Sequence, residues 1–469
     1  MTRTPTHQLP SFDSREPSRS NSRRLGPLAF ALAGGIALLA GCGGGGGGSS
    51  TPPVTHTVSG TISGLKGSVV LRNNTDTVSV PGNGSFMFPA AITAGDAYDA
   101  QVQSLQFASQ TCLVANGSGV ASVDVNDIVV TCMPHNVPKY AYVANYNDGT
   151  LSQYAIEADG SLAIVASGTV AVEQEPNSVV VHPGGKFIYV VNGESGSISQ
   201  FAIGADGALE QLDPSVAPTG TSPSSLAISP SGKHAYASNF GENTVSQYTI
   251  RADGGFEPMA LPLVNTGAGP QAIRLDPEGR YAYVVDSNNA SRTVSQYTIG
   301  ADGALTAMAE APAATGTDPR FIAVDPLGEF VYVTNWADDT ISQYAIGATG
   351  ALTLLADATV PTGNEPGEIA IDPEGKYAYV ANRGDHTVSQ YTIGADGALV
   401  PNVPPTVATD PNPSSITITP DGRFAYVTSQ DAGTATRYAI NVDGTLEPGG
   451  PVSAAGANAY SISIASDYQ

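Results

Sequence analysis

Several charged and aromatic side chains between residues 320 and 386 stand out, because the rest of the chain repeats a different pattern at the same positions. These residues are Arg320, Phe321, Trp336, Asp338, Asp339, Glu368, Arg383, Asp385 and His386. Arginine, carboxylate and aromatic side chains that converge on one pocket are typical of a site for an anionic or sugar-like ligand. In an enzyme, Arg320 would polarise a carbonyl group and Glu368 or His386 would act as the base. The alternative interpretation is that they are ordinary variable loop residues on a solvated surface.

The repeat that defines these exceptions is marked by the tripeptide Ser-Gln-Tyr, with Phe replacing Tyr in one copy. Its central residues are Gln153, Gln200, Gln247, Gln296, Gln343 and Gln390, spaced 47, 47, 49, 47 and 47 residues apart. A decayed copy follows, with Arg437 at the central position. A period in the forties built from strand-like units predicts a β-propeller.

One repeat, which can be read from Asp318 onward, predicts four strands at residues 321–324, 330–334, 340–346 and 351–360. The strand that follows the repeated proline occurs six times, and the alternating segment 459–464 supplies a seventh. The first repeat begins near Lys139 without such a strand. We therefore expect the C-terminal strand to complete the first blade and close a seven-bladed ring, because an open ring would leave an unpaired edge.

The pattern Tyr-Val-x-Asn, followed by Val/Ile-Ser-Gln-Tyr-x-Ile-x-x-Asp-Gly-x-Leu, resembles the lactonase family of seven-bladed β-propellers. That family includes bacterial 6-phosphogluconolactonase and the fungal carboxy-cis,cis-muconate cyclase, and the related YVTN surface-layer repeats look similar. The resemblance covers residues 138–469. It implies the propeller fold for that region, while the residues that repeat are the structural ones.

The resemblance also implies where a ligand site would lie. In this family the innermost strand begins, after the proline, at the face where ligands bind, and the loop after Tyr-Val-x-Asn opens on that face. Gln271 and Tyr460 would complete the rim of such a site. Enzymes of the family carry Pro-His-x-His and Asn-Glu-Leu motifs, both of which this sequence lacks, and Asn192-Gly193-Glu194 is the nearest counterpart of the second. No catalytic residue is therefore carried over from the family.

The N-terminus reads as a targeting segment over residues 1–42. A basic stretch ending at Arg24 precedes an apolar run, and Leu39-Ala40-Gly41-Cys42 resembles the bacterial lipoprotein box, in which Cys42 is lipidated. Residues 43–54 form a tether rich in Gly, Ser, Thr and Pro. We expect a protein anchored by lipid in the cell envelope, on the outer membrane, exported by either the Sec or the Tat route. The alternative is an ordinary secretory signal with an incidental cysteine.

Residues 55–133 contain several short alternating runs separated by Gly and Asn turns, which predicts a small β-sandwich that acts as a spacer or docking module. Cys112 and Cys132 are an even pair in an exported chain, so we expect a disulfide between them. The fold class is therefore all-β, with a disulfide-stapled sandwich before the propeller.

The chain has a formal net charge of −23, which argues against nucleic acid as a partner. Its six histidines lack metal-ligand spacing, and no phosphate loop or cofactor motif is present, so we expect neither metal nor cofactor. We expect a monomer. Two hypotheses remain: a binding module that presents its propeller face to a small ligand, a glycan or an envelope protein, or a lactone hydrolase or cycloisomerase-like enzyme with a diverged site.

Overall fold

The computed structural model describes residues 53–65, 67–105, 110–134, 136–288, 291–452 and 456–468. The regular secondary structure within these ranges consists of β-strands. The targeting segment, Cys42 and the tether as far as Pro52 lie outside the described residues. In the part of the chain that is described, no helix is long and apolar enough to cross a membrane.

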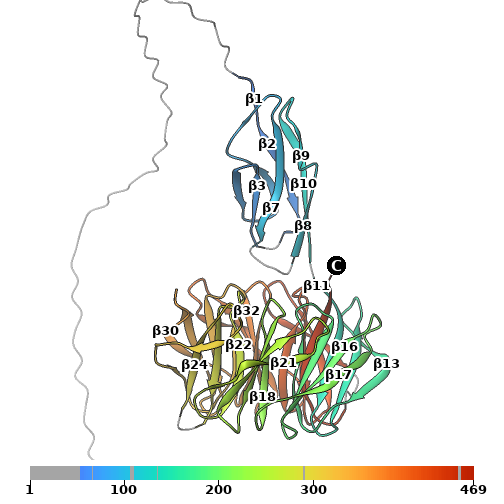
Figure 1. The fold of residues 1–469 in the computed structure, drawn as a ribbon, viewed down its shortest axis with the longest axis vertical. Helices are drawn as coiled ribbons and strands as arrows, with labels where there is room; N and C mark the ends of the chain where they lie inside the picture. Colours follow the sequence, from blue (N-terminus) through green and yellow to red (C-terminus); the bar gives the residue numbers. More distant parts are fainter. Residues whose placement is uncertain are drawn as a thin grey trace, which may run out of the picture. The chain divides into compact units, whose positions relative to one another are not determined.

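The region before the propeller contains two four-stranded sheets (Figure 1). One sheet has the order β5 (Gly84–Met87), β2 (Val58–Ser63), β10 (Val125–Pro134) and β8 (Gln110–Ala115). The other has the order β4 (Asp76–Val80), β3 (Val69–Asn73), β7 (Ala97–Leu105) and β9 (Ser118–Val120), and β1 (Thr55–His56) pairs with β6 (Ile92–Thr93). Alternate residues of both sheets, among them Val58, Leu71 and Ile128, form one buried apolar cluster. This is the predicted small sandwich.

The predicted disulfide is also confirmed. Cys112 on β8 and Cys132 on β10 face each other directly in an antiparallel strand pair, and their sulfur atoms are bonded.

Seven further sheets form the blades of the propeller. Each blade has four strands from the centre outward, except that the outer strand of the fourth blade is divided into two short strands. The first strand of each blade, which we call the inner strand, is β14 (Pro176–Val181), β18 (Pro223–Ile228), β22 (Pro270–Leu275), β27 (Pro319–Val324), β31 (Pro366–Ile371), β35 (Pro413–Ile418) or β39 (Ala459–Tyr468). Inner strands of neighbouring blades contact one another and so surround the central channel.

The remaining strands extend outward from the inner strands. The second strands are β11 (Asn136–Asn145), β15 (Phe187–Asn192), β19 (His234–Asn239), β23 (Tyr281–Asp286), β28 (Phe330–Asn335), β32 (Tyr377–Asn382) and β36 (Phe424–Ser429). The third strands are β12 (Thr150–Ile156), β16 (Ser197–Ile203), β20 (Thr244–Ile250), β24 (Thr293–Ile299), β29 (Thr340–Ile346), β33 (Thr387–Ile393) and β37 (Thr434–Ile440). The outer strands are β13 (Leu162–Ala171), β17 (Leu209–Pro218), β21 (Phe256–Asn265), β25 (Leu305–Ala307) with β26 (Ala313–Ala314), β30 (Leu352–Pro361), β34 (Leu399–Ala408) and β38 (Leu446–Val452).

The ring closes as predicted from the sequence. Strand β39 pairs antiparallel with β11, so Ile464 lies opposite Ala141 and Ile462 lies opposite Val143. The first blade is therefore built from β11, β12 and β13 together with β39, which follows all the other propeller strands in the chain.

The repeated glutamine joins neighbouring blades. In the third blade, Gln247 donates to the carbonyl oxygen of Leu261 on its own outer strand at 2.7 Å. Its side-chain oxygen accepts the backbone N–H of Leu305 in the next blade, also at 2.7 Å. In the last blade Arg437 cannot accept such a bond and instead donates to the backbone oxygen of Asp159 in the first blade.

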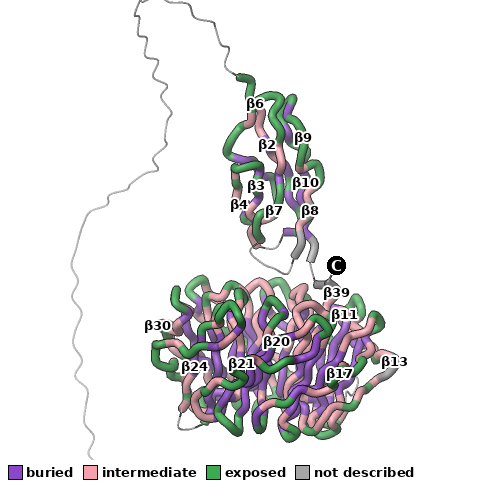
Figure 2. The backbone as a smooth tube through the Cα atoms, viewed as in Figure 1, coloured by how far each residue is buried: buried purple, intermediate pink, exposed green. Residues whose placement is uncertain are grey.

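The repeated tyrosines of the second strands fill the spaces between blades. Tyr236 is fully buried and donates its hydroxyl to the carbonyl oxygen of Gly303 in the next blade at 2.6 Å. The second and third strands of the blades are largely buried, whereas the outer strands and many of the loops are exposed (Figure 2).

The asparagine that ends most second strands is fully buried. Asn239 donates to the hydroxyls of Thr244 and Ser246, at 3.0 and 2.9 Å, and accepts the N–H of Gly220 at 3.1 Å. These partners lie on the next strand and on the preceding loop. In the fourth blade the equivalent residue is Asp286, also fully buried.

Candidate functional site

The central channel contains three cavities whose lining residues overlap. The upper cavity, at the end where the inner strands begin, has an empty volume of about 340 Å³ and is lined by Gln271, Arg320, Phe321, Trp336, Gly367, Arg383, Pro413, Ser414, Gln430 and Tyr460. The middle cavity, of about 480 Å³, shares Gln271, Phe321, Ser414 and Tyr460 with it. The lower cavity, of about 900 Å³, shares Ser178, Arg274, Glu368 and Ser461 with the middle cavity. These volumes include space open to solvent.

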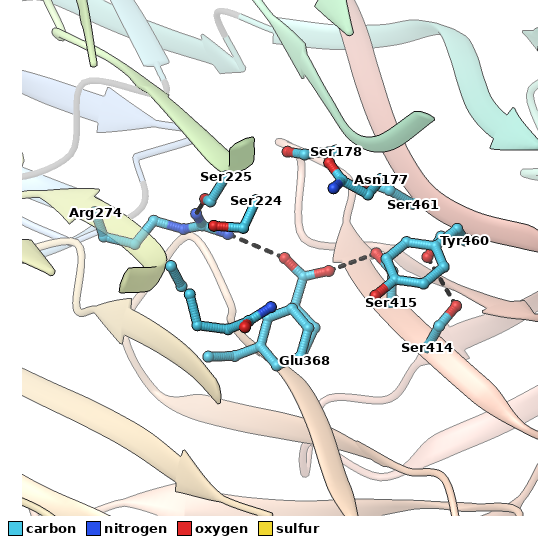
Figure 3. A pocket seen from close by; sticks show the side chains of 13 residues that line it. Asn177, Ser178, Ser224, Ser225, Arg274, Glu368, Ser414, Ser415, Tyr460 and Ser461 are labelled. Atoms are coloured by element: carbon cyan, nitrogen blue, oxygen red, sulfur yellow. Dashed lines mark hydrogen bonds and ion pairs between the residues drawn. The ribbon is translucent and has the colours of Figure 1, made fainter. Parts of the chain in front are cut away.

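Five of the inner strands present two consecutive residues to the middle cavity, and in four of them the strand register shifts just after the repeated proline. In the third blade, for example, the shift lies between Pro223 and Ser225, and both Ser224 and Ser225 line the cavity. Bulges of this kind redirect side chains. Serine is the commonest residue at these positions, so most of the wall can donate or accept hydrogen bonds (Figure 3).

Two arginines lie around the single tryptophan in the wall of the upper cavity. The guanidinium carbon of Arg320 is 3.9 Å from the centre of the Trp336 ring, and that of Arg383 is 5.6 Å from it. These distances fit cation–π contacts, which hold the flat guanidinium groups in fixed orientations. Arg320 also pairs with the carboxylate of Asp318 at 2.9 Å.

Arg383 has neutral partners instead. Its guanidinium donates to the amide oxygens of Asn412 and Gln430, the latter at 3.1 Å. Its positive charge is therefore oriented by amides rather than neutralised by a carboxylate within the described residues. A planar cation held in this way is suited to binding an anionic group.

Tyr460 lies between the upper and middle cavities, at the start of the closing strand. Its ring stacks on that of Tyr146, with the centres 5.3 Å apart, and the hydroxyl of Ser414 donates to its backbone oxygen at 2.7 Å. Burial raises the pKa of Tyr460, while Arg320 and Arg383 oppose that shift. The phenol is therefore neutral at physiological pH and can donate a hydrogen bond.

An ion pair lies between the middle and lower cavities. Arg274 on β22 donates to Glu368 on β31 at 3.1 Å, and the hydroxyl of Ser415 donates to the other oxygen of Glu368 (Figure 3). The Glu368 side chain is 20 % exposed. Burial raises the pKa of this carboxyl, although Arg274, Ser415 and the N–H of Ile416 act in the opposite direction.

The predicted site residues fall into three groups. Gln271, Arg320, Phe321, Trp336, Arg383 and Tyr460 all line the upper cavity. Glu368 lies deeper in the channel. Arg320 lines the upper cavity, Glu368 pairs with Arg274 deeper in the channel, and His386 lines none of the three cavities.

The remaining predicted residues, Asp338, Asp339, Asp385 and His386, form hydrogen bonds with the backbone of neighbouring loops. Asp385 accepts the backbone N–H of Asn364 at 2.7 Å, and Asp338 accepts that of Thr317 at 2.5 Å. The ring nitrogen Nδ1 of His386 accepts the N–H of Asn412 at 3.1 Å, and the backbone φ of His386 is +55°. Asp339 has a similar φ of +53° and accepts the N–H of Glu365 at 2.9 Å. These contacts fix the loops behind the cavity wall.

Sequence reasoning missed Arg274, although a signal for it exists. Residues two apart on a strand share a face, so the third and fifth residues of each inner strand face the same way. At the fifth position the other blades carry small or medium-sized side chains, namely Val180, Ala227, Ala323, Ala370, Thr417 and Ser463. Comparing blades at this fifth position would have singled out Arg274 as the one large charged side chain.

Within the described ranges, no three His, Cys, Asp or Glu side chains come together in an arrangement that could hold a metal ion. The cavity walls offer hydroxyl, amide, guanidinium and carboxylate groups. These groups are suited to binding a polar organic molecule through hydrogen bonds and ion pairs.

Comparison with solved structures shows a fold that is used for different purposes. The periplasmic gluconolactonase PpgL of Pseudomonas aeruginosa is 20% identical, with a TM-score of 0.61, and the match covers 70% of this chain and 99% of that one. A Bacteroides uniformis protein provisionally assigned as a 6-phosphogluconolactonase is 19% identical over the same shares, also with a TM-score of 0.61. The hydrazine synthase of Kuenenia stuttgartiensis is 22% identical, with a TM-score of 0.51, over 64% of this chain and 92% of that one.

No curated protein matches the chain. The family model described as "Lactonase, 7-bladed beta-propeller" matches residues 162–457, which is more than half of the sequence. This range includes all the arginines, Trp336 and Glu368 of the three cavities. The chain therefore belongs to the lactonase family of seven-bladed β-propellers.

Proposed function

We propose that the propeller is a binding module for a small anionic, polyhydroxylated molecule, which enters the upper cavity of the central channel. The observation that carries this proposal is the arrangement of Arg320 and Arg383 around Trp336. The guanidinium of Arg383 is held by amide oxygens, so its charge is available to a ligand. This local positive charge contrasts with the net charge of −23 on the whole chain.

The rest of the wall suits the hydroxyl groups of such a ligand. Gln271, Ser414 and Gln430 line the upper cavity and can donate or accept hydrogen bonds. Trp336 already has the Arg320 guanidinium 3.9 Å from its ring centre, so its main role is to orient the arginines. The ligand would then be held by an ion pair at one end and hydrogen bonds along its length.

Calorimetric titration of the purified protein with D-gluconate tests the proposal, with D-glucitol as the uncharged counterpart. We expect gluconate to bind and glucitol to bind far more weakly. Because a bond to a charged group contributes about 1.5–3 kcal/mol, Arg383→Gln should weaken gluconate binding by about tenfold or more. Arg423→Gln is the matched control, since Arg423 lies 4.8 Å from the centre of the Phe424 ring but lines none of the three cavities. Equal binding of gluconate by the wild type and Arg383→Gln would refute the proposal.

Lactone hydrolysis is a second candidate function, favoured by the raised pKa of Glu368 inside a cavity that also contains Arg274. Glu368 would remove a proton from water as the water oxygen attacks the lactone carbonyl carbon. Arg274 would stabilise the oxyanion, and the ring C–O bond would then break as the protonated Glu368 returns its proton to the leaving ring oxygen, which gives a hydroxyl group and a carboxylic acid that ionises to a carboxylate. Acid release from D-glucono-δ-lactone in a pH-stat, lost in Glu368→Gln, would support an enzyme. Hydrolysis at the background rate would leave the binding function.

We further propose that the chain is exported and held in the cell envelope through a lipidated Cys42, where an envelope protein or glycan would be its partner. The disulfide between Cys112 and Cys132 supports export, because disulfides persist in oxidising compartments. Labelling of cells with a clickable fatty acid tests the anchor. The wild type should carry the label and Cys42→Ala should not, whereas an unlabelled wild type would contradict the anchor.

A further inference from the structure

The Arg274–Glu368 ion pair spans the channel between blades that are not neighbours. Arg274 comes from β22 in the fourth blade and Glu368 from β31 in the sixth, with β27 of the fifth blade between them. Both side chains line the middle and the lower cavity. Figure 3 shows the two side chains reaching toward each other. The pair therefore forms the floor of the middle cavity.

Each charge of this floor is compensated. Arg274 donates through Nη2 to Glu368 at 3.1 Å and through Nη1 to the backbone oxygen of Ile273 at 3.0 Å. The second oxygen of Glu368 accepts from Ser415. The arginine and glutamate side chains are 36 and 20 % exposed. The floor is thus locally neutral, yet it offers both donors and acceptors to a ligand.

The two ends of the site consequently differ in charge. At the upper end, the Arg383 guanidinium contacts amide oxygens and keeps its positive charge. Toward the floor the wall carries hydroxyl groups, from Ser178, Ser224, Ser225, Ser414, Ser415 and Ser461. A hydroxyl group of a ligand can bond to these residues without disturbing the ion pair.

A second anionic group on the ligand would bind unfavourably at the floor. Glu368 would repel it, and binding to Arg274 would require that Arg274 leave Glu368. A carboxylate left without its partner in a secluded site is costly, because its desolvation is no longer offset by the cation. The floor therefore disfavours a ligand with charges at both ends.

We propose that the Arg274–Glu368 pair makes the site selective for ligands with one anionic end and a neutral, hydroxylated remainder, and that it rejects chains with an anionic group at each end. This inference rests on the proposed binding function, because it concerns the selectivity of the same channel. Arg274 and Glu368 act here as specificity-determining residues.

Titration with D-gluconate and D-glucarate tests the inference. The two acids have the same carbon skeleton, but gluconate carries a carboxylate at one end and glucarate carries one at each end. The readout is the ratio of their dissociation constants, and we expect the wild type to prefer gluconate by about tenfold or more. Glu368→Gln leaves Arg274 without its anion, so the preference for gluconate should fall by about tenfold. Arg274→Gln leaves Glu368 without its cation, so the preference should increase. The double variant should fall between the two single variants.

The outcomes separate this inference from the proposed function. If gluconate does not bind the wild type, both are overturned. If gluconate and glucarate bind the wild type and Glu368→Gln with the same ratio, the selectivity is overturned while the binding function stands. Thermal melting checks that each variant folds. Should a single variant unfold, the double variant, which leaves no unpaired charge, must still show a smaller preference than the wild type, and an unchanged preference overturns the inference.

Discussion

The hydroxyl of Tyr426 in the seventh blade donates to the carbonyl oxygen of Gly160 in the first blade at 2.6 Å, across 266 residues of sequence. The same bond joins each earlier blade to the next, as between Tyr236 and Gly303. Tyr426 is fully buried, so water cannot replace the bond if it is lost. This contact and the pairing of β39 with β11 together close the ring.

Tyr426→Phe should lower the free energy of unfolding by about 1–2 kcal/mol, because it leaves the buried carbonyl of Gly160 without its partner. Chemical denaturation measures this change. Tyr281→Phe is the control, since the exposed bond from Tyr281 to the oxygen of Ala348 is 3.3 Å long and its loss should cost less. Equal effects of the two substitutions would contradict the importance of the buried closure bond.

A chain that ends at Asn458 lacks β39 and exposes the edge of β11. We expect it to melt at a lower temperature and to form oligomers through that edge, because unpaired strand edges pair with other chains. Light scattering after gel filtration measures the oligomers. A chain that ends at Ala465 keeps the pairing from Ala459 to Ala465 and should stay monomeric. The expectation fails if both truncated chains behave like the full chain.

Asp286 should make the propeller less stable as the pH rises. Burial raises its pKa to about 6, and its Oδ1 atom has no hydrogen-bond partner among the described residues. The same carboxyl has a pKa near 3.8 when unburied, so the unfolded chain releases this proton at lower pH than the folded one. The free energy of unfolding should therefore fall between about pH 4 and pH 6, by roughly 3 kcal/mol for a shift of about two pKa units.

Asp286→Asn removes this penalty, since asparagine occupies the equivalent place in most other blades. We expect the variant to be more stable than the wild type at pH 7.5 and similar to it at pH 4. Denaturation curves over this pH range provide the measurement. The reverse change, Asn239→Asp, should introduce the same pH dependence in the third blade. A variant Asp286→Asn with the wild-type pH profile would show that Asp286 does not carry the effect.

The fluorescence of Trp336 should report ligand binding, because Trp336 is the only tryptophan in the chain and lines the upper cavity. A ligand that draws the Arg383 guanidinium away from its position 5.6 Å from the ring centre changes the surroundings of the indole. We expect a saturable change in emission on adding gluconate, with the same dissociation constant as in calorimetry. The emission should not respond to gluconate in Arg383→Gln at concentrations that saturate the wild type. Calorimetric binding without any change in emission would place the ligand away from Trp336.

The fold could be predicted in detail because each blade repeats the same structural residues at the same spacing. A proline at the start of the inner strand, a buried tyrosine and the bridging glutamine recur at one spacing, so a single repeat predicts the others. The closing strand was also predictable. The first repeat lacked an inner strand, and the segment 459–464 was a strand left over after the last repeat, so it could fill that position.

The candidate site could be predicted only in part. Deviations between blades identified Arg320, Trp336 and Arg383, which the structure brings to one cavity. The pairing of Glu368 was missed because Arg274 lies 94 residues earlier, and only the three-dimensional ring brings β22 and β31 to the same channel, with β27 between them. The ring nitrogen Nδ1 of His386 accepts the N–H of Asn412, a loop contact that residue type alone does not reveal.

The position of β39 in the chain has a consequence for how the protein is made. Six blades can assemble as they emerge from the ribosome, but the first blade must wait with the edge of β11 exposed until the last strand has been synthesised. During that interval the propeller is an open arc rather than a ring.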